Sequence, residues 1–282
     1  MSVKNYAPKN IEDLFSDLAK MTPKSKIIAG GTDLNISLHA GVVKPDALLY
    51  VGGINEMRQI VKTDGKVEIG AAATMSEIAK SRLLQEGLTA IADAAADVGS
   101  AQIRNNATIG GSVANASPAG DILVPLFLLK AEAVIANSKG ELRRVPIPEV
   151  LLGPGKNSLC YDEAVIKFLL PLALPGQRSA FVKLGFRKAV TVARIGLAAS
   201  LDMTEDGLIK AAEMMVGAIS PVPLRIETAE QYMLGKRPDE IVETVGRMLS
   251  DLIIEKTPKE FDRDYKIGAA CGAVDNLLKR FY

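Results

Sequence analysis

Apolar and polar residues in the first 55 positions follow the spacings of one amphipathic helix and two short strands. Apolar side chains recur at helical spacing from Ile11 to Leu18, and Asn10 with Asp13 forms a capping pair before that run. Residues 27–29 and 48–51 are short apolar runs that each end at a glycine pair, which predicts two strands. The pattern therefore predicts a compact α/β unit over about residues 1–55.

The next segment combines a hairpin with two helices. Residues 59–62 and 66–69 flank Thr63-Asp64-Gly65, which is typical of a β-hairpin turn. The sequence Thr74-Met75-Ser76-Glu77 is a capping box and predicts a helix that continues to about Leu84. The alanine-rich stretch 88–98 has apolar residues on much of its helical surface, which predicts a buried helix.

The second half of the chain divides at a proline-bounded stretch. A strongly apolar run at 123–129 precedes predicted strands at 131–136 and 163–170, with a turn at 137–140. Pro171 and Pro175-Gly176 end the last strand, so we predict a domain boundary near residue 175. Beyond it the pattern predicts a separate sheet and then helices, with strands at 181–186, 194–201 and 209–216 and helices at about 226–234, 239–254 and 268–281.

Composition excludes several classes of protein. The 282 residues carry a net charge of +1, so no overall field favours nucleic acid or an anionic membrane. No segment approaches the roughly 18 consecutive apolar residues of a membrane span, and Met1–Pro8 lacks the apolar core of a signal peptide. These observations predict a cytoplasmic protein with no nucleic-acid partner and no membrane span.

The cysteines and the histidine give no support for a metal site. Cys160 and Cys271 lie far apart and outside any Cys-x-x-Cys pair, and His39 is the single histidine of the chain. One histidine does not make a conventional zinc site, and no disulfide framework follows from two distant cysteines. The sequence also shows no nucleophile and no acid–base pair, so it predicts no catalytic residue and no metal ligand.

The first candidate site is a glycine pair that follows the predicted strand at 27–29. The segment reads Ala29-Gly30-Gly31-Thr32-Asp33. Glycine reaches positive φ cheaply and lets a backbone approach a ligand, and successive peptide N–H groups in such turns can bind an anion. An ordinary turn has the same signature. Asp33 is suited either to cap backbone N–H groups or to bind a ribose hydroxyl.

The second candidate site is the segment from Thr108 to Asp121. Small and polar residues fill it, and only Ile109 and Val113 are larger and apolar. Such a segment is costly to order without a partner, and unusual loops often bind ligands. The alternative is a buried irregular connection stabilised by its own polar side chains. Two glycine-rich turns can together hold the two phosphates of one dinucleotide.

Common nucleotide-binding signatures are absent from the sequence. Neither glycine pair completes a Gly-x-Gly-x-x-Gly pattern at the start of a helix, so a Rossmann fingerprint is not supported. The segment Gly153–Ser158 lacks the Gly-x-x-x-x-Gly-Lys-[Ser/Thr] spacing of a phosphate loop, and Pro154 has no N–H to donate. We interpret that segment as an ordinary connection.

Taken together, the two loops resemble those of the FAD-binding subunit of molybdenum hydroxylases, the family of carbon monoxide dehydrogenase medium subunits and xanthine dehydrogenase flavin domains. The resemblance runs essentially end to end, and its motifs are Ala29–Leu34, Arg104–Asp121 and Ser220-Pro221-Val222-Pro223-Leu224-Arg225. It implies an α+β fold. A two-subdomain α/β FAD-binding domain of the PCMH (vanillyl-alcohol-oxidase-like) type would span residues 1–175, with subdomains about 1–55 and 56–175. A C-terminal domain, residues 176–282, would contain three antiparallel strands and a helical bundle.

The resemblance also implies FAD as the cofactor and a set of residues that bind it. The two loops would enclose the pyrophosphate, mainly through backbone N–H groups, while Asn115 and Asp121 would contact the adenosine half or its ribose. Val165 and Lys183 match positions near the isoalloxazine or adenine ends, and Ile109 would pack against the flavin ring. The implied cofactor-binding residues are Ile27, Ile28, Ala29, Gly30, Gly31, Thr32, Asp33, Leu34, Thr108, Ile109, Gly110, Gly111, Ser112, Asn115, Asp121, Val165 and Lys183.

One segment departs from the family pattern. The usual Arg-Arg-x-x-Asp-x-Ala reads Arg187-Lys188-Ala189-Val190-Thr191-Val192-Ala193, with Thr191 where Asp is common. Whether this segment faces the flavin or a partner stays open. The chain also lacks a cysteine-rich insertion, so the resemblance does not imply an iron–sulfur cluster in this chain.

The absence of other chemistry makes FAD the expected electron carrier, with the protein positioning it. The resemblance implies an electron-transfer subunit of a hetero-oligomeric molybdenum hydroxylase. A molybdenum-cofactor large subunit would pass electrons to an iron–sulfur small subunit. Electrons would then pass from that subunit to FAD and on to NAD, ferredoxin or quinone. Two other hypotheses stay open: a non-redox module that binds a nucleotide or CoA, and a stand-alone flavin reductase.

Overall fold

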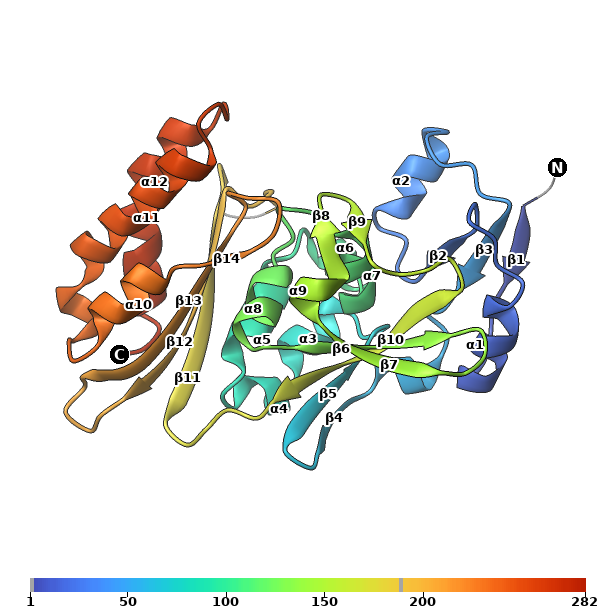
Figure 1. Cartoon of the computed structure of the whole chain (residues 1–282), viewed down its shortest axis with the longest axis horizontal. Helices are drawn as coiled ribbons and strands as arrows, with labels where there is room; N and C mark the ends of the chain where they lie inside the picture. Colours follow the sequence, from blue (N-terminus) through green and yellow to red (C-terminus); the bar gives the residue numbers. More distant parts are fainter. Residues whose placement is uncertain (1–2, 188–189) are drawn as a thin grey trace. The chain divides into compact units, whose positions relative to one another are not determined.

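The computed structural model describes residues 3–187 and 190–282, which form two compact units (Figure 1). Unit 1 contains the chain up to Ile78, Ala101–Ala116 and Lys130–Pro171. Unit 2 contains Ala79–Ser100, Ser117–Leu129 and the chain from Leu172 to its end. The stretch predicted as one FAD-binding domain, residues 1–175, therefore contributes to both units, and the domain boundary near residue 175 stays a prediction.

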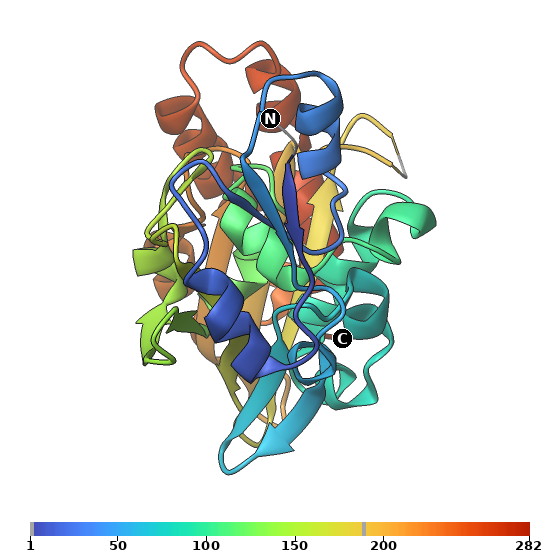
Figure 2. The ribbon, with the colours of Figure 1, turned by 90° about the vertical axis from the view of Figure 1, so that its right-hand side faces the viewer.

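The N-terminal part of unit 1 is a parallel sheet in the order β1-β3-β2, whose strands lie side by side in Figures 1 and 2. Asn10 accepts a hydrogen bond from the backbone N–H of Asp13 at 2.8 Å, which confirms the predicted capping pair. The sequence pattern does not predict β1, because its three residues are largely exposed and mostly polar. The elements are β1 (Lys4–Tyr6), α1 (Ile11–Leu18), β2 (Lys26–Ile28), α2 (Leu34–His39) and β3 (Ala47–Tyr50).

A larger antiparallel sheet in the order β4-β5-β10-β6-β7 forms the core of unit 1. On its central strand β10, Phe168 is fully buried and lies opposite Ile69 on one neighbour and Ala133 on the other. This sheet confirms the predicted strands and hairpin. The elements are β4 (Ile60–Thr63), β5 (Lys66–Gly70), β6 (Glu132–Asn137), β7 (Leu142–Pro146) and β10 (Glu163–Pro171), preceded by the 3-10 turn η1 (Asn55–Arg58).

Shorter elements complete unit 1. The segment at 153–158 is part of a two-stranded hairpin, as an ordinary connection would be, and its strands are β8 (Leu151–Gly153) and β9 (Lys156–Asn157). Helix α9 (Ile147–Val150) precedes it, and helices α6 (Ala101–Arg104) and α7 (Ile109–Asn115) lie in the segment that returns from unit 2.

The capping box before α3 (Met75–Lys80) is confirmed by two reciprocal bonds. The backbone N–H of Thr74 donates to the Glu77 carboxylate at 2.7 Å, and the N–H of Glu77 donates to the Thr74 hydroxyl at 3.2 Å. The predicted extension of this helix to Leu84 is wrong. Ser81 adopts an extended conformation with ψ 113°, which interrupts the helical hydrogen bonds, and a separate turn, α4 (Arg82–Gln85), follows.

Unit 2 is an antiparallel sheet, in the order β11-β12-β13-β14, with helices on both faces (Figure 1). Helices α10, α11 and α12 cover one face, and α5 and α8 cover the other. The predicted three strands and helical bundle are confirmed, and β14 adds a two-residue edge. The elements are α5 (Thr89–Asp97), α8 (Leu123–Leu128), β11 (Gln177–Leu184), β12 (Ile195–Met203), β13 (Ile209–Gly217), β14 (Leu224–Arg225), α10 (Glu227–Met233), η2 (Pro238–Glu240), α11 (Val242–Lys256) and α12 (Arg263–Leu278).

The described residues contain neither a helix suited to cross a membrane nor a cluster suited to hold a metal ion. None of the helices in residues 3–187 and 190–282 has the length and apolar character needed to cross a membrane. In the same residues, no group of three or more His, Cys, Asp or Glu side chains is placed to hold a metal ion.

Candidate functional site

The two glycine-containing segments come together inside unit 1. A Cβ atom on Gly30 would lie 1.9 Å from the backbone oxygen of Asn106, just before the second segment begins. No side chain fits at that distance, so glycine is required for the two backbones to approach. Its neighbour Gly31 is required for another reason, because its φ of +67° lies in the left-handed region. The sequence alone did not show this pairing of the loops.

The first loop, residues 29–33, presents backbone donors. In the described part of the chain, the backbone N–H groups of Gly30, Gly31, Thr32 and Asp33 do not donate to any protein acceptor. Asp33 occupies the position before α2 but makes no capping hydrogen bond, and it is exposed. The capping role considered for Asp33 is therefore not observed, and its carboxylate is accessible to a ligand.

The second segment differs from its sequence-based description, because much of it is helical. Thr108 is the N-cap of α7 and accepts a hydrogen bond from the N–H of Gly111 at 3.1 Å. The N–H groups of Ile109 and Gly110 donate to the backbone oxygens of Ala73 and Ala71 at 3.1 and 2.8 Å. The N–H of Ser112 donates to the Thr108 oxygen at 3.0 Å. These four groups are engaged within the protein, and their role as donors to an anion stays a prediction.

The end of α7 is fixed by the β8–β9 hairpin. Ala116 adopts a left-handed conformation with φ 48°, and its backbone oxygen accepts from the N–H of Gly155 at 2.9 Å. The Asn157 side chain donates to the Ala114 oxygen at 2.7 Å. Asn115 is exposed at this helix end. The chain passes from unit 1 to unit 2 between Ala116 and Ser117, within the predicted loop.

The rest of the second segment, from Ser117 to Asp121, belongs to unit 2, where Asp121 forms a buried ion pair with Lys183. The Lys183 ammonium lies 2.6 Å from a carboxylate oxygen of Asp121, and the two side chains are only 6% and 7% exposed. The same ammonium donates to the backbone oxygen of Asp97 at 2.9 Å. Burial raises the pKa of the Asp121 carboxyl to about 6, and the Lys183 charge opposes that rise. The structure thus brings together two predicted site residues that lie 62 positions apart.

The apolar residues of the predicted site differ in their exposure. Ile109 is fully buried at the start of α7, and Val165 is 7% exposed on β10, where the pairing with β6 is irregular. Ile27, Ile28 and Leu34 are partly exposed around the first loop. The roles of all these residues toward a cofactor stay predictions.

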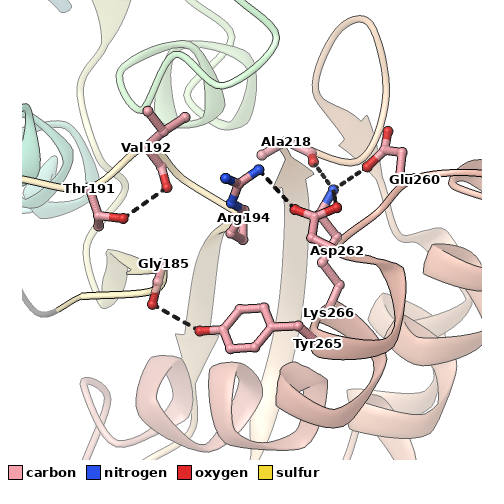
Figure 3. Close-up of polar contacts among 9 residues, drawn as sticks. All are labelled: Gly185, Thr191, Val192, Arg194, Ala218, Glu260, Asp262, Tyr265 and Lys266. Carbon is pink, nitrogen blue, oxygen red and sulfur yellow. Dashed lines mark hydrogen bonds and ion pairs between the residues drawn. The ribbon is translucent and has the colours of Figure 1, made fainter.

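The segment that departs from the family pattern lies beside a charged network in unit 2 (Figure 3). Lys188 and Ala189 lie outside the described residues, whereas the Thr191 hydroxyl donates to the Val192 oxygen at 3.2 Å. Arg194 donates to the buried Asp262 carboxylate at 3.0 Å. Nothing in the local sequence indicates this pairing, because the two residues lie 68 positions apart.

Lys266 extends the same network (Figure 3). Its ammonium is almost fully buried and donates to the Ala218 oxygen at 2.9 Å and to Glu260, with Asp262 at 3.4 Å. Tyr265 on the same helix donates its hydroxyl proton to the Gly185 oxygen at 2.9 Å. These contacts attach α12 to both ends of the segment that includes Thr191, which gives the network a structural role.

Comparison with known proteins identifies both halves of the chain. Residues 1–173 match the family model described as the FAD binding domain in molybdopterin dehydrogenase, and residues 180–281 match the CO dehydrogenase flavoprotein C-terminal domain. The chain is 33% identical over 212 residues to the xanthine dehydrogenase FAD-binding subunit of Escherichia coli O157:H7, which covers 74% of this chain and 72% of the relative.

Two further relatives extend the match. The nicotinate dehydrogenase FAD-subunit of Eubacterium barkeri is 31% identical over 236 residues, covering 82% of this chain and 79% of the relative. Among solved structures, carbon monoxide dehydrogenase from Hydrogenophaga pseudoflava has a chain that superposes with a TM-score of 0.86 at 27% identity, covering 99% of this chain and 96% of the other.

Proposed function

Because the chain belongs to the family of FAD-binding subunits of molybdopterin dehydrogenases, we propose that it passes electrons between an iron–sulfur partner subunit and an external acceptor. The observation that carries this proposal is the match of both family models, in order, over nearly the whole chain. The acceptor class is NAD, ferredoxin or quinone. The molybdenum-cofactor large subunit would supply electrons to the iron–sulfur small subunit, in a cytoplasmic hetero-oligomer.

The residues of the candidate site fit FAD. The first loop offers backbone N–H groups that donate to no acceptor in the part of the chain that the structure describes, and such groups suit the charged pyrophosphate. Asp121 has a buried carboxylate oxygen, Oδ1, that has no hydrogen-bond partner among the described residues, and a hydroxyl of the cofactor would satisfy it. FAD, when bound, supplies the redox chemistry, because flavin exchanges electrons with both one-electron and two-electron partners.

The chain's own residues would bind and orient the cofactor rather than react. We assign Ala29–Asp33 to the pyrophosphate through backbone N–H groups, with Ile27, Ile28 and Leu34 as apolar flanks. Thr108–Ser112 would then support the site structurally, because the N–H groups of residues 109–112 are engaged within the protein. Asn115, Asp121 and Val165 complete the proposed contacts, and Lys183 lies beside Asp121, 2.6 Å from its carboxylate. No residue of this chain is proposed as catalytic.

The absorption spectrum of the purified protein tests the FAD assignment. We expect yellow flavin bands and the release of FAD on denaturation. A colourless protein that cannot be reconstituted with FAD would contradict the assignment and favour a non-redox module.

The proposed electron transfer between the subunits is tested in the assembled complex. Coexpression with the iron–sulfur and molybdenum subunits should yield one complex whose flavin absorbance bleaches when the substrate of the large subunit is added. Rapid NADH oxidation by the isolated chain, with no bleaching by that substrate in the complex, would instead indicate a stand-alone flavin reductase.

A further inference from the structure

The Lys183–Asp121 pair of unit 2 leaves one hydrogen-bond acceptor unused. Lys183 contacts Asp121 Oδ2 at 2.6 Å, whereas Oδ1 of the same carboxylate is buried and has no partner in the described residues. A buried carboxylate oxygen without a partner is costly, so its presence indicates a place for a donor that the described residues do not provide.

The charges of Lys183 and Asp97 both affect the ionisation of the Asp121 carboxyl. Lys183 approaches from β11, and Asp97 at the end of α5 adds a negative charge that opposes ionisation of Asp121. Helix α8, which begins two residues after Asp121, is composed entirely of apolar residues and proline. The ionisation of Asp121 in this setting therefore depends on Lys183.

Lys183 is itself fixed in place by a second contact. Its ammonium donates to the backbone oxygen of Asp97, the last residue of α5, at 2.9 Å. A helix C-terminus carries partial negative charge, which stabilises an ammonium there. With a side chain only 6% exposed, Lys183 is placed to hold the carboxylate in one charge state and one orientation.

We propose that Lys183 is a positioning residue, which keeps Asp121 ionised so that Oδ1 accepts a hydrogen bond from a hydroxyl of FAD. The inference rests on the proposed FAD function and assigns Lys183 a role through Asp121, in place of the direct cofactor contact implied by the resemblance. It also predicts the sign of a pH effect. Binding favours the ionised carboxylate, so FAD affinity is retained above the pKa of Asp121, about 6, and lost as the pH falls through it.

The test is an FAD titration of the apo form of the full chain, followed by flavin fluorescence between pH 5 and pH 8. For the wild type, we expect the dissociation constant to rise about tenfold from pH 7 to pH 5, as one-proton linkage requires. Asp121→Asn should bind more weakly at pH 7 and show no such dependence. A wild-type affinity for FAD that does not change with pH would overturn the inference and leave the FAD function intact.

Substitution of the lysine tests its role directly. Lys183→Met should weaken FAD binding at pH 7 at least about tenfold and move the loss of affinity to a higher pH, because the pKa of the unpaired carboxyl rises further. Lys183→Arg should restore most of the affinity. A midpoint unchanged from the wild type in Lys183→Met would show that Lys183 only supports the fold, and would overturn the inference.

Two further variants distinguish a positioning role of Lys183 from a general loss of stability. Arg225→Met removes the partner of another buried carboxylate in unit 2, Glu230, and should leave the pH midpoint of FAD binding unchanged. If Lys183→Met folds poorly, the double variant Lys183→Met/Asp121→Asn removes both charges together and should show the flat pH profile of Asp121→Asn. Absence of FAD binding by the wild type at every pH would instead overturn the proposed function itself.

Discussion

In the first loop, Gly30 lies against the backbone of Asn106, whereas in the second segment Gly110 and Gly111 lie in the first turn of α7. Within residues 3–187 and 190–282, the backbone N–H groups of the first loop have no acceptor, whereas the second segment uses the corresponding groups to form its helix and to join residues 71–73. Similar glycine pairs therefore do different work. One presents donors, whereas the other lies in the first turn of a helix whose N–H groups are engaged within the protein.

Substitution of Gly30 should have the largest effect on this arrangement. Gly30→Ala places a Cβ against a backbone oxygen, which cannot move as a flexible side chain can, so the two loops must separate. We expect at least about a hundredfold loss of FAD affinity and a loss of about 1–3 kcal/mol in the free energy of unfolding, as for overpacking. Urea denaturation and FAD titration measure the two quantities.

The matched control is Gly272→Ala in α12, where a new Cβ meets nothing within 4 Å. Alanine is favoured over glycine in a helix, so this variant should be stabilised by about 0.5–1 kcal/mol and bind FAD as the wild type does. Wild-type affinity in Gly30→Ala would show that the loop contact does not shape the cofactor site.

Gly111→Val should affect binding more than stability. Gly111 is exposed, and its new Cβ would meet only the Thr108 hydroxyl, at 3.0 Å. The valine would add bulk to the segment that the resemblance places beside the pyrophosphate, so we expect at least about tenfold weaker FAD binding with a loss of stability near 1 kcal/mol or less. Equal FAD affinity in the variant and the wild type would contradict the placement of the second segment beside the phosphates.

Thr108→Val should give the smallest effect of the three. It preserves the shape of the side chain but removes the oxygen that accepts from the Gly111 N–H. Loss of an N-cap costs about 1 kcal/mol, which corresponds to about 2–4 °C in the melting temperature of a chain this size. Thermal unfolding of the apo form measures it. An unchanged melting temperature would mean that the bond to Ala73 and its neighbours, and not the cap, holds the start of α7.

Sequence patterns predicted the elements whose residues interact locally. The capping box at Thr74 and the cap at Asn10 each involve residues three positions apart, so spacing alone identifies them. Helix α7 escaped prediction because two of its seven residues are glycine, the poorest helix former after proline. It forms because Thr108 caps it and because Ile109 and Val113, four residues apart, are both buried.

The candidate site depended more on contacts between distant residues. The approach of Gly30 to Asn106 and the pairing of Lys183 with Asp121 join residues more than 60 positions apart, and no local pattern specifies such pairs. The resemblance to a family indicated that these residues belong to one site. It did not indicate that the N–H groups of α7 are already engaged, which follows only from their acceptors in the fold.

Unit 2 is built from three separate stretches of the chain, so a cut at residue 175 would divide it between two fragments. Helices α5 and α8 precede residue 175 in the chain, yet they pack on β11, β12 and β13, which follow it. A fragment that stops at residue 175 would carry both helices without their sheet, and all six side chains of α8 are buried in the intact chain. Such a fragment should aggregate when expressed alone, and coexpression with the remainder, supplied as a second polypeptide, should restore it to solution.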